Sequence, residues 1–322
     1  MKYSKIGKKQ IAISKISLGL WKGFSHSSLM EKIYLYDYAF ERGVNHYDSA
    51  PGYDDGLSEE FLSKFLINKK REDIIITTKI YFPSKKIPTK GLNKANLQIN
   101  LEQTLKKLKT DYIDFLLCHR YDNETPIYET IDTINKLIFS GKVREWGIST
   151  YTPFQLCETF FSALHLSSQT PSIAHYPYNP FNRTIEMDLK EALQKIQIPI
   201  AAYYPLSQGI LTGKYSKGIS NKSRAAKKKL KNEMWDFSYE KLKKVEKLIK
   251  LGSSLNVSAA NLSLLWCLHN KSVATLLTSV NNKKQLDENL KIFKFAYNNE
   301  LHSKINNIFK NPPLNIYTGI KY

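Results

Sequence analysis

Short apolar segments rich in β-branched residues alternate along this chain with longer segments of helical periodicity. In one of the helical segments Leu97, Leu101, Leu105 and Leu108 share one face, and the segment 242–249 is amphipathic in the same way. A strand, helix, strand rhythm predicts parallel strand pairing with right-handed crossovers. We predict eight strands, at Ile16–Leu20, Val44–Tyr47, Ile74–Thr78, Tyr112–Leu117, Glu145–Ser149, Ser172–Tyr176, Pro199–Tyr204 and Ala274–Ser279.

Eight such units close naturally into an α/β fold of the (β/α)8 TIM-barrel type, which commonly takes about 250 residues. The remaining residues of the 322 are expected to form segments outside the barrel. Residues 2–16 alternate around a Gly-Lys-Lys turn and predict an N-terminal β-hairpin. The lysine-rich segment Lys214–Phe237 predicts a long loop, and Asn311–Tyr322, with two prolines, a C-terminal tail. Because no linker divides the sequence, we predict a single domain over residues 1–322.

The competing architecture is a doubly wound dinucleotide-binding fold, which requires a glycine-rich fingerprint. No GxGxxG sequence follows the first predicted strand. Residues Gly209 to Tyr215 resemble a phosphate-binding loop, but three residues separate the glycines where four are needed. Tyr215 also follows the lysine where Ser or Thr would contact the metal, so both nucleotide motifs are excluded.

Charge changes this picture little. The chain has 48 Lys and Arg against 29 Asp and Glu, a net charge of +19. Such a balance is compatible with nucleic-acid binding, but the lysines are scattered and the densest cluster, at 224–231, is modest. We therefore predict solvated lysine faces and no nucleic-acid partner.

Other partners and compartments are constrained by what the sequence lacks. No stretch approaches the roughly 18 to 20 apolar residues of a membrane span, so no membrane partner is expected. Cys118, Cys157 and Cys267 are far apart and odd in number, which fits neither a disulfide framework nor a metal site. We predict a cytoplasmic protein without a metal ion.

The carboxyl ends of barrel strands form the active site in this architecture. The predicted ends carry Trp21, Asp48, Lys79, His119, Ser149, His175, Tyr203 and Ser279. Three of these can act with Tyr53, because a buried ammonium at Lys79 favours the phenolate and is expected to lower the pKa of Tyr53. Asp48 would keep Lys79 charged, and His119 would donate a hydrogen bond to the oxygen that Tyr53 protonates. Such a proton donor suits a carbonyl that is being reduced by hydride.

Each of these residues also has a structural explanation. An aspartate after a strand is commonly a helix cap, and a loop tyrosine such as Tyr53 usually packs. His119, after four apolar or sulfur-containing residues, is as compatible with a hydrogen-bonded core histidine as with a catalyst. Only the combination on successive strands favours catalysis.

In addition, the chain resembles the aldo-keto reductase family in order along nearly its whole length. The segments that carry the resemblance are 43–60, 76–79, 108–130, 141–149, 177–183, 205–215 and 285–290. The CHRYDNETP run at 118–126 and SRA at 223–225 resemble the branch that contains potassium-channel β subunits and their bacterial homologues. The resemblance implies a barrel enzyme that uses NADPH/NADP+ without a Rossmann fold.

By the same resemblance, Asp48, Tyr53, Lys79 and His119 form the catalytic tetrad, with Tyr53 as the acid. Ser149 would contact the nicotinamide carboxamide, Tyr203 would stack on its ring, and Arg224 would hold the 2′-phosphate. The full set of cofactor-binding residues that it implies is Trp21, Asp48, Ser149, Thr150, His175, Tyr203, Leu206, Gly209, Lys214, Arg224, Gln285, Glu288 and Asn289.

The sequence departs from the family pattern at several of these positions. Thr150 stands where the family usually has Asn, and His175 where it usually has Gln. Leu20, Tyr204 and Ser279 also replace smaller or different residues. Losing an amide hydrogen bond costs about 0.5 to 1.5 kcal/mol. Because Thr150 and His175 still donate or accept, we expect weakened or repositioned cofactor binding.

These observations predict NADPH-dependent reduction of an aldehyde or ketone, sugar-like carbonyls included, to an alcohol. The partners expected are a small-molecule carbonyl substrate and, as an open alternative, further copies of the chain. A second hypothesis is a nucleotide-binding regulatory subunit with little or no turnover. Aromatic and basic loop residues, among them Phe82, Arg120 and Trp235, suit an anionic or sugar-like substrate.

Overall fold

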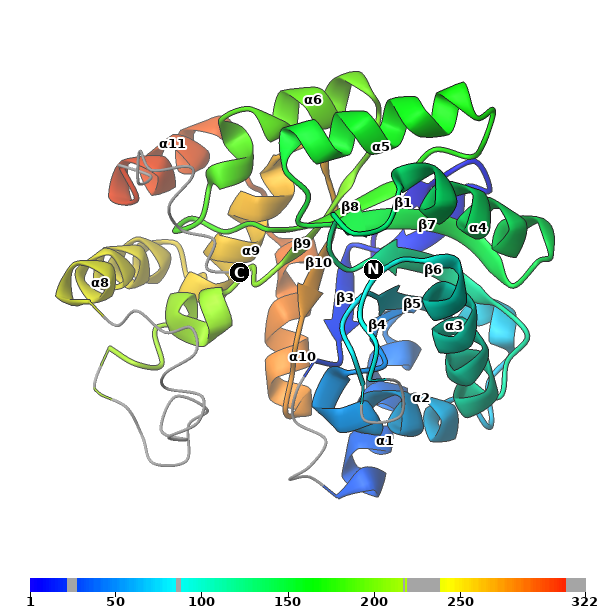
Figure 1. Cartoon of the computed structure of the whole chain (residues 1–322). Helices are drawn as coiled ribbons and strands as arrows, with labels where there is room; N and C mark the ends of the chain where they lie inside the picture. The colour runs from blue at the N-terminus through cyan, green and yellow to red at the C-terminus, as the bar shows by residue number, and fades with distance from the viewer. Residues whose placement is uncertain (22–27, 85–87, 217, 219–237, 311–322) are drawn as a thin grey trace.

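Eight parallel strands close into a barrel in this computed structural model, which describes residues 1–21, 28–84, 88–216, 218 and 238–310 (Figure 1). The order around the barrel is β10-β3-β4-β5-β6-β7-β8-β9, so its first strand pairs with its last. The strands are β3 (Ile16–Gly19), β4 (His46–Asp48), β5 (Ile75–Ile80), β6 (Ile113–Cys118), β7 (Val143–Ser149), β8 (Ile173–Pro177), β9 (Ile200–Tyr203) and β10 (Val273–Thr278). The predicted (β/α)8 fold is confirmed, and each predicted strand is found with its ends shifted by at most two residues.

Helices surround this barrel (Figure 1). They are α1 (Leu29–Glu41), α2 (Leu57–Phe65), α3 (Lys94–Leu108), α4 (Ile127–Phe139), α5 (Pro153–His165), α6 (Leu189–Lys195), α8 (Tyr239–Ser254), α9 (Ala259–His269), α10 (Lys283–Leu290) and α11 (Asn299–Ile308). Side-chain caps fix where several of them begin: Thr152 and Gln155 form a capping box at α5, and Asn282 caps α10. The predicted leucine face of α3 is buried, as expected from its spacing.

The predicted hairpin is also present and closes the amino end of the barrel. β1 (Tyr3–Ile6) pairs antiparallel with β2 (Ile11–Ser14). The hairpin side chains Ile6, Ile11 and Ile13 join one apolar cluster with inward-facing strand residues such as Phe115 and Leu117. The turn needs a glycine, because Gly7 has φ +72° and a Cβ there would lie 2.3 Å from the Glu145 carboxylate carbon.

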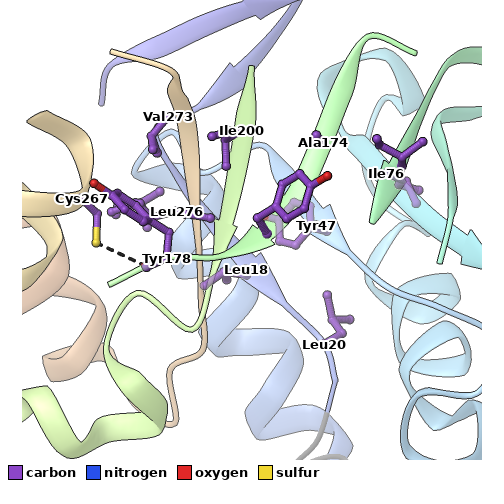
Figure 2. Packing of buried hydrophobic residues seen from close by; sticks show 14 of the residues in the cluster. Leu18, Leu20, Tyr47, Ile76, Ala174, Tyr178, Ile200, Cys267, Val273 and Leu276 are labelled. Atoms are coloured by element: carbon purple, nitrogen blue, oxygen red, sulfur yellow. Dashed lines mark hydrogen bonds between the residues drawn. The ribbon is translucent and has the colours of Figure 1, made fainter. Parts of the chain in front are cut away.

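A second, larger apolar cluster lies between the strands and the helices. Alternate strand residues point outward into it (Figure 2), among them Leu18, Tyr47, Ile76, Ala174, Ile200 and Leu276. Burial of such side chains contributes about 1.5 to 3 kcal/mol each. The period-two alternation therefore leaves the intervening residues of each strand to face the barrel interior.

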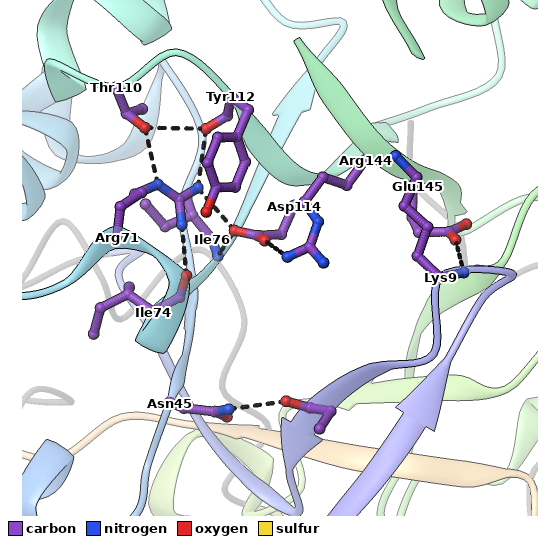
Figure 3. Close-up of polar contacts among 11 residues, drawn as sticks. Lys9, Asn45, Arg71, Ile74, Ile76, Thr110, Tyr112, Asp114, Arg144 and Glu145 are labelled. Atoms are coloured by element: carbon purple, nitrogen blue, oxygen red, sulfur yellow. Dashed lines mark hydrogen bonds and ion pairs between the residues drawn. The ribbon is translucent and has the colours of Figure 1, made fainter. Parts of the chain in front are cut away.

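Charged side chains tie the strands together at the amino end (Figure 3). Asp114 of β6 is fully buried, and its two carboxylate oxygens each lie 2.8 Å from a guanidinium, one from Arg71 and one from Arg144. The backbone N–H of Ile76 donates to the same carboxylate at 2.9 Å. Both carboxylate oxygens of Asp114 are thus paired, which is typical of a structural role.

Several expectations fall on the segments outside the described residues. These include the tail 311–322 and most of the loop 214–237, so the single domain over 1–322 stays a prediction. Within the described ranges, no single helix is long and apolar enough to cross a membrane. Only α8 and α9 taken together reach that length and apolarity, and they are bent by 95° with respect to each other.

Candidate active site

A buried ion pair lies at the carboxyl end of the barrel. Asp48 is the last residue of β4, and Lys79 faces inward from the neighbouring strand β5. Lys79 Nζ lies 2.7 Å from both carboxylate oxygens of Asp48 and donates to the Ser49 carbonyl at 2.9 Å. The two side chains are 3% and 5% exposed, so water screens the pair little.

Tyr53 and His119 complete the group predicted from the sequence. Tyr53 opens the short helix η1 (Tyr53–Gly56), and the Lys79 ammonium lies over its ring, 4.7 Å from the centroid. His119 follows β6, and its ring meets that of Tyr53 edge-on with centroids 5.9 Å apart. The structure therefore brings the four residues together.

Burial dominates the electrostatics of these groups. It raises the pKa of Asp48 and lowers the pKa of Lys79, while the attraction between the two charges opposes both shifts. Burial, with the charges of Lys79 and Arg120, lowers the pKa of His119 well below its usual range. His119 is therefore neutral at physiological pH and can both donate and accept a hydrogen bond.

One expectation from the sequence is wrong. The pKa of Tyr53 is raised well above its usual value, first by burial and then by the nearby charge of Asp48 and by Tyr203. Burial is the main reason, because it disfavours the charged phenolate, while the Lys79 ammonium donates to Asp48 and the Ser49 carbonyl. Tyr53 consequently keeps its proton at neutral pH and stands as a donor.

Residues of β7, β8 and β9 border the ion pair on its other side. The hydroxyl of Thr150 lies 3.0 Å from that of Tyr203 and 3.4 Å from that of Ser149. His175 is only 1% exposed, and its Nδ1 lies 3.8 Å from Asp48 Oδ1. Neither ring nitrogen of His175 has a hydrogen-bond partner among the described residues, which is unusual for a buried polar group.

The loop after β9 holds the residues expected to border a pyrophosphate. Gly209 lies in η4 (Ser207–Thr212) with φ +97°, and a Cβ there would lie 2.7 Å from Lys214 Nζ. The positive φ favours glycine here, and the absence of a side chain leaves room for the Lys214 ammonium beside the backbone. Gln208 Oε1 is buried beside it without a partner. Leu206 precedes the same turn and packs against the outer apolar cluster.

The residues expected at the adenosine end lie together on α10. Asn289 is buried, and Gln285 Oε1 accepts the Asn281 N–H at 2.8 Å. Glu288 accepts hydrogen bonds from Lys291 at 2.8 Å and from Asn261 of α9 at 3.2 Å. Because α9 packs against both η4 and α10, it joins these two groups. Arg224 lies outside the described residues.

The remaining predicted positions lie around the mouth. Trp21 follows β3, and its ring lies 5.9 Å from that of Tyr204. Ser279 is exposed after β10. Phe82 packs edge-on against His119, with ring centroids 5.0 Å apart, and the Arg120 guanidinium lies 5.4 Å from the Phe82 ring.

Sequence reasoning missed His46, two residues before Asp48 and therefore on the same face of β4. Its ring nitrogens bond Ser17 at 2.9 Å and Thr77 at 2.7 Å, and burial lowers its pKa to about 3. The period-two alternation of β4 is the signal that would have found it. Arg120 was expected only at the rim, although its charge affects the pKa of Tyr53, Lys79, His119 and Tyr203.

The sequence model of the aldo/keto reductase family matches residues 15–310. The chain belongs to the aldo/keto reductase family. It is 32% identical over 297 residues to a protein of Arabidopsis thaliana named "Probable voltage-gated potassium channel subunit beta", covering 90% of each chain. A protein of Oryza sativa subsp. japonica with the same name is 31% identical with the same coverage.

A solved structure agrees with this assignment. A crystal structure of a thermostable aldo-keto reductase in complex with the inhibitor epalrestat superposes with a TM-score of 0.77 at 25% identity. The match covers 96% of this chain and 100% of the other. Family and fold are those of an oxidoreductase, and aldo/keto reductases generally bind NAD(P)H.

Proposed function

We propose that this aldo/keto reductase uses NADPH to reduce an aldehyde or ketone to an alcohol. The observation that supports it best is the buried pair of Lys79 and Asp48, which lies against Tyr53. Such an arrangement offers a proton donor next to fixed charge in a site that excludes water.

The residues around the pair fit a nicotinamide nucleotide. His175 presents two buried, unpartnered ring nitrogens, and Ser149 and Thr150 present hydroxyls on the same side of the barrel. Gly209 and Lys214 offer a close-packed ammonium suited to a phosphate. In this proposal Ser149, Thr150 and His175 hold the carboxamide, Tyr203 packs on the nicotinamide, and Trp21 borders it. Leu206, Gly209 and Lys214 hold the pyrophosphate, while Arg224, Gln285, Glu288 and Asn289 hold the adenosine end.

In this mechanism the cofactor provides the hydride, and side chains of the protein provide the proton and hold the substrate. The bound cofactor supplies the hydride that reduces the carbonyl carbon. Tyr53 donates its hydroxyl proton to the carbonyl oxygen as negative charge develops there, and the Lys79 ammonium stabilises the phenolate that remains. Neutral His119 donates a hydrogen bond to the same oxygen and orients the carbonyl. Asp48 keeps Lys79 charged and in place.

Replacing the proton donor tests this mechanism. In Tyr53→Phe we expect carbonyl reduction, followed as NADPH oxidation over an aldehyde and ketone panel, to fall by about 10²-fold or more. NADPH binding, followed by intrinsic fluorescence, should remain. Tyr34→Phe, on the exposed face of α1, is the matched control and should leave turnover unchanged. Unchanged turnover in Tyr53→Phe would refute the assignment of the acid.

The preference for NADPH over NADH is tested separately. We expect NADPH to saturate the fluorescence change at lower concentration than NADH, because Arg224 and nearby lysines suit a 2′-phosphate. Arg224→Ala should weaken NADPH much more than NADH. Equal losses for both nucleotides would show that Arg224 does not contact the 2′-phosphate.

The substrate class follows from the rim of the site. Arg120 lies beside Phe82 and His119, which suits a carbonyl compound with an anionic or sugar-like substituent. Arg120→Gln should raise KM for a carboxylated aldehyde by about tenfold, equal to about 1.4 kcal/mol. An uncharged aldehyde of similar size should show little change, and an equal rise for both aldehydes would argue against an anionic substrate.

A regulatory subunit that binds nucleotide with little turnover is the second candidate. The names of the plant relatives and the substituted carboxamide contacts Thr150 and His175 favour it. This candidate predicts NADPH binding, negligible turnover over a broad carbonyl panel and copurification with a larger assembly. Brisk turnover by the isolated protein would exclude it.

A further inference from the structure

Helix α5 carries an apolar stripe on its outer face. Phe154, Phe161 and Leu164 are 74%, 59% and 52% exposed, and Cys157 between them is partly exposed. The opposite face of the helix already packs on the barrel through Leu156, Thr159, Ser162 and Ala163. In Figure 1, α5 lies on the outside of the molecule, next to α6. Three large apolar side chains of this helix therefore face outward, although Leu156 and Phe160 pack against the core.

Helix α5 itself carries no Lys or Arg. The chain has 48 Lys and Arg, yet none occurs between Arg144 and Arg183, the longest such interval in the sequence. Copies of a chain with net charge +19 repel one another over most of their surfaces. Glu158, the one carboxylate of α5, accepts a hydrogen bond from the Tyr121 hydroxyl and is held to the side of the stripe. The stripe itself therefore adds no like-charge repulsion between two copies.

We propose that α5 is a docking surface for α5 of a second copy of this chain, packed antiparallel across a two-fold axis. The stripe positions are three, four and three residues apart, which is the spacing of a helix-pairing seam. In an antiparallel pair centred on the middle of the stripe, Phe154 meets Leu164 of the partner subunit. Cys157 then meets Phe161 of the partner subunit. Each contact occurs twice, as a two-fold interface requires.

The charge pattern favours a second copy over a foreign partner. A protein attracted to a chain of net charge +19 would carry acidic groups, and this stripe offers no cation to receive them. Uncharged apolar side chains are complementary to an identical stripe. A single helix pair lies at the small end of interface sizes, so we expect a dissociation constant in the range of about 1 to 100 μM.

Sedimentation velocity of the purified full-length chain over about 1 to 100 μM tests the proposal. The wild type should shift from monomer to dimer, and Phe161→Glu should weaken this association by at least about tenfold. Ile67→Glu, a similarly exposed position after α2, is the matched control and should associate like the wild type. A thermal melt of each variant shows that the fold is retained. A wild type that stays monomeric, or equal effects of the two substitutions, would overturn the proposal.

Cross-linking tests the antiparallel arrangement itself. In a Cys157→Ser background, Phe154→Cys with Leu164→Cys places thiols about 15 Å apart along one helix, too far for a disulfide within a chain. Mild oxidation should therefore give a covalent dimer only when the thiol introduced at position 154 pairs with the thiol introduced at position 164 across the two-fold axis. Phe154→Cys alone should give none, and the buried Cys118 and Cys267 should not react. Equal cross-linking by the single variant, or none by the double variant, would overturn the antiparallel contact.

Discussion

Two deeply buried polar side chains, one at each end of the barrel, differ in whether their polar atoms have partners. At the amino end, the Asp114 carboxylate is paired with two guanidinium groups and a backbone N–H. At the carboxyl end, His175 is as deeply buried but bonds through neither of its ring nitrogens. A buried polar group without a partner costs about 1 to 3 kcal/mol. At His175 the carboxyl end thus carries a stability cost that is absent at Asp114.

The backbone shows the same difference. Near the amino end, non-glycine residues with left-handed φ angles, such as Lys109 and Gln197, follow helix C-termini, where this conformation is common. At the carboxyl end, Thr150 and Tyr204 adopt it directly after strands β7 and β9. Strain at these positions persists because surrounding contacts hold it, and it is typical of binding sites. The difference indicates that one end stabilises the barrel and the other is prepared for a ligand.

The largest expected effect comes from Lys79→Met at the carboxyl end. In the proposed mechanism the ammonium stabilises the Tyr53 phenolate, so its removal should lower kcat by roughly 10³-fold, about 4 kcal/mol. Cofactor binding, measured by fluorescence, should change little. A fall of less than about tenfold would mean that the pair with Asp48 is structural, like its counterpart at the amino end.

Asp114→Ala makes the corresponding change at the amino end. It leaves Arg71 and Arg144 without their buried acceptor, so the free energy of unfolding in urea should drop by about 3 kcal/mol. The kcat of the folded fraction should stay unchanged. Asp132→Ala, which removes an exposed pair with Lys136, is the control and should cost less than about 1 kcal/mol.

The next largest expected effect is a loss of stability at low pH, caused by buried histidines in the barrel interior. Burial lowers the pKa of His46 to about 3 and that of His175 well below its usual range, so both bind protons only after unfolding. The stabilisation that these neutral histidines give the folded state is complete above about pH 6.5. As the pH falls, the free energy of unfolding drops by up to about 1.4 kcal/mol per pH unit for each histidine. Urea unfolding at several pH values measures this slope. His175→Leu should reduce this slope by the contribution of one histidine. An unchanged slope would show that His175 does not bind a proton on unfolding.

The smallest expected effect is a gain in stability. At neutral pH, His175→Leu removes two buried, unpartnered nitrogens and should raise the free energy of unfolding by about 1 to 2 kcal/mol. NADPH binding should weaken, because the proposed contact between His175 and the carboxamide is lost. Ser272→Ala removes another buried unpartnered atom, the Ser272 Oγ, and should leave NADPH binding unchanged. A variant of His175 that is less stable than the wild type would show that this nitrogen pair has a partner in solution.

Much of the fold follows from the sequence because alternation and helical spacing are local. Ile76 and Leu97, for example, lie on the buried faces that their spacing predicts. The same alternation placed Asp48 and Lys79 inside the barrel at adjacent strand ends. Position along the chain therefore predicted which side chains meet.

The conformation of the site could not be predicted in this way. The direction of the Lys79 ammonium depends on where Asp48 and the Ser49 carbonyl lie in space, and the pKa of Tyr53 depends on how deeply the fold buries its hydroxyl. Nothing in the residue types of Thr150 or Tyr204 indicates a left-handed backbone, which is imposed by packing. The bond between the Thr150 and Tyr203 hydroxyls joins residues far apart in the sequence.

The seam between β3 and β10 has a consequence for how the protein is made. Leu18 pairs with Thr278, so the first strand of the barrel finds its second neighbour only near the far end of the chain. During synthesis from the N-terminus, β3 keeps an open edge until β10 has been made. Contacts of such long sequence separation form slowly. We expect ribosome-bound chains truncated before residue 273 to stay protease-sensitive, with closure of the barrel as a late step in folding.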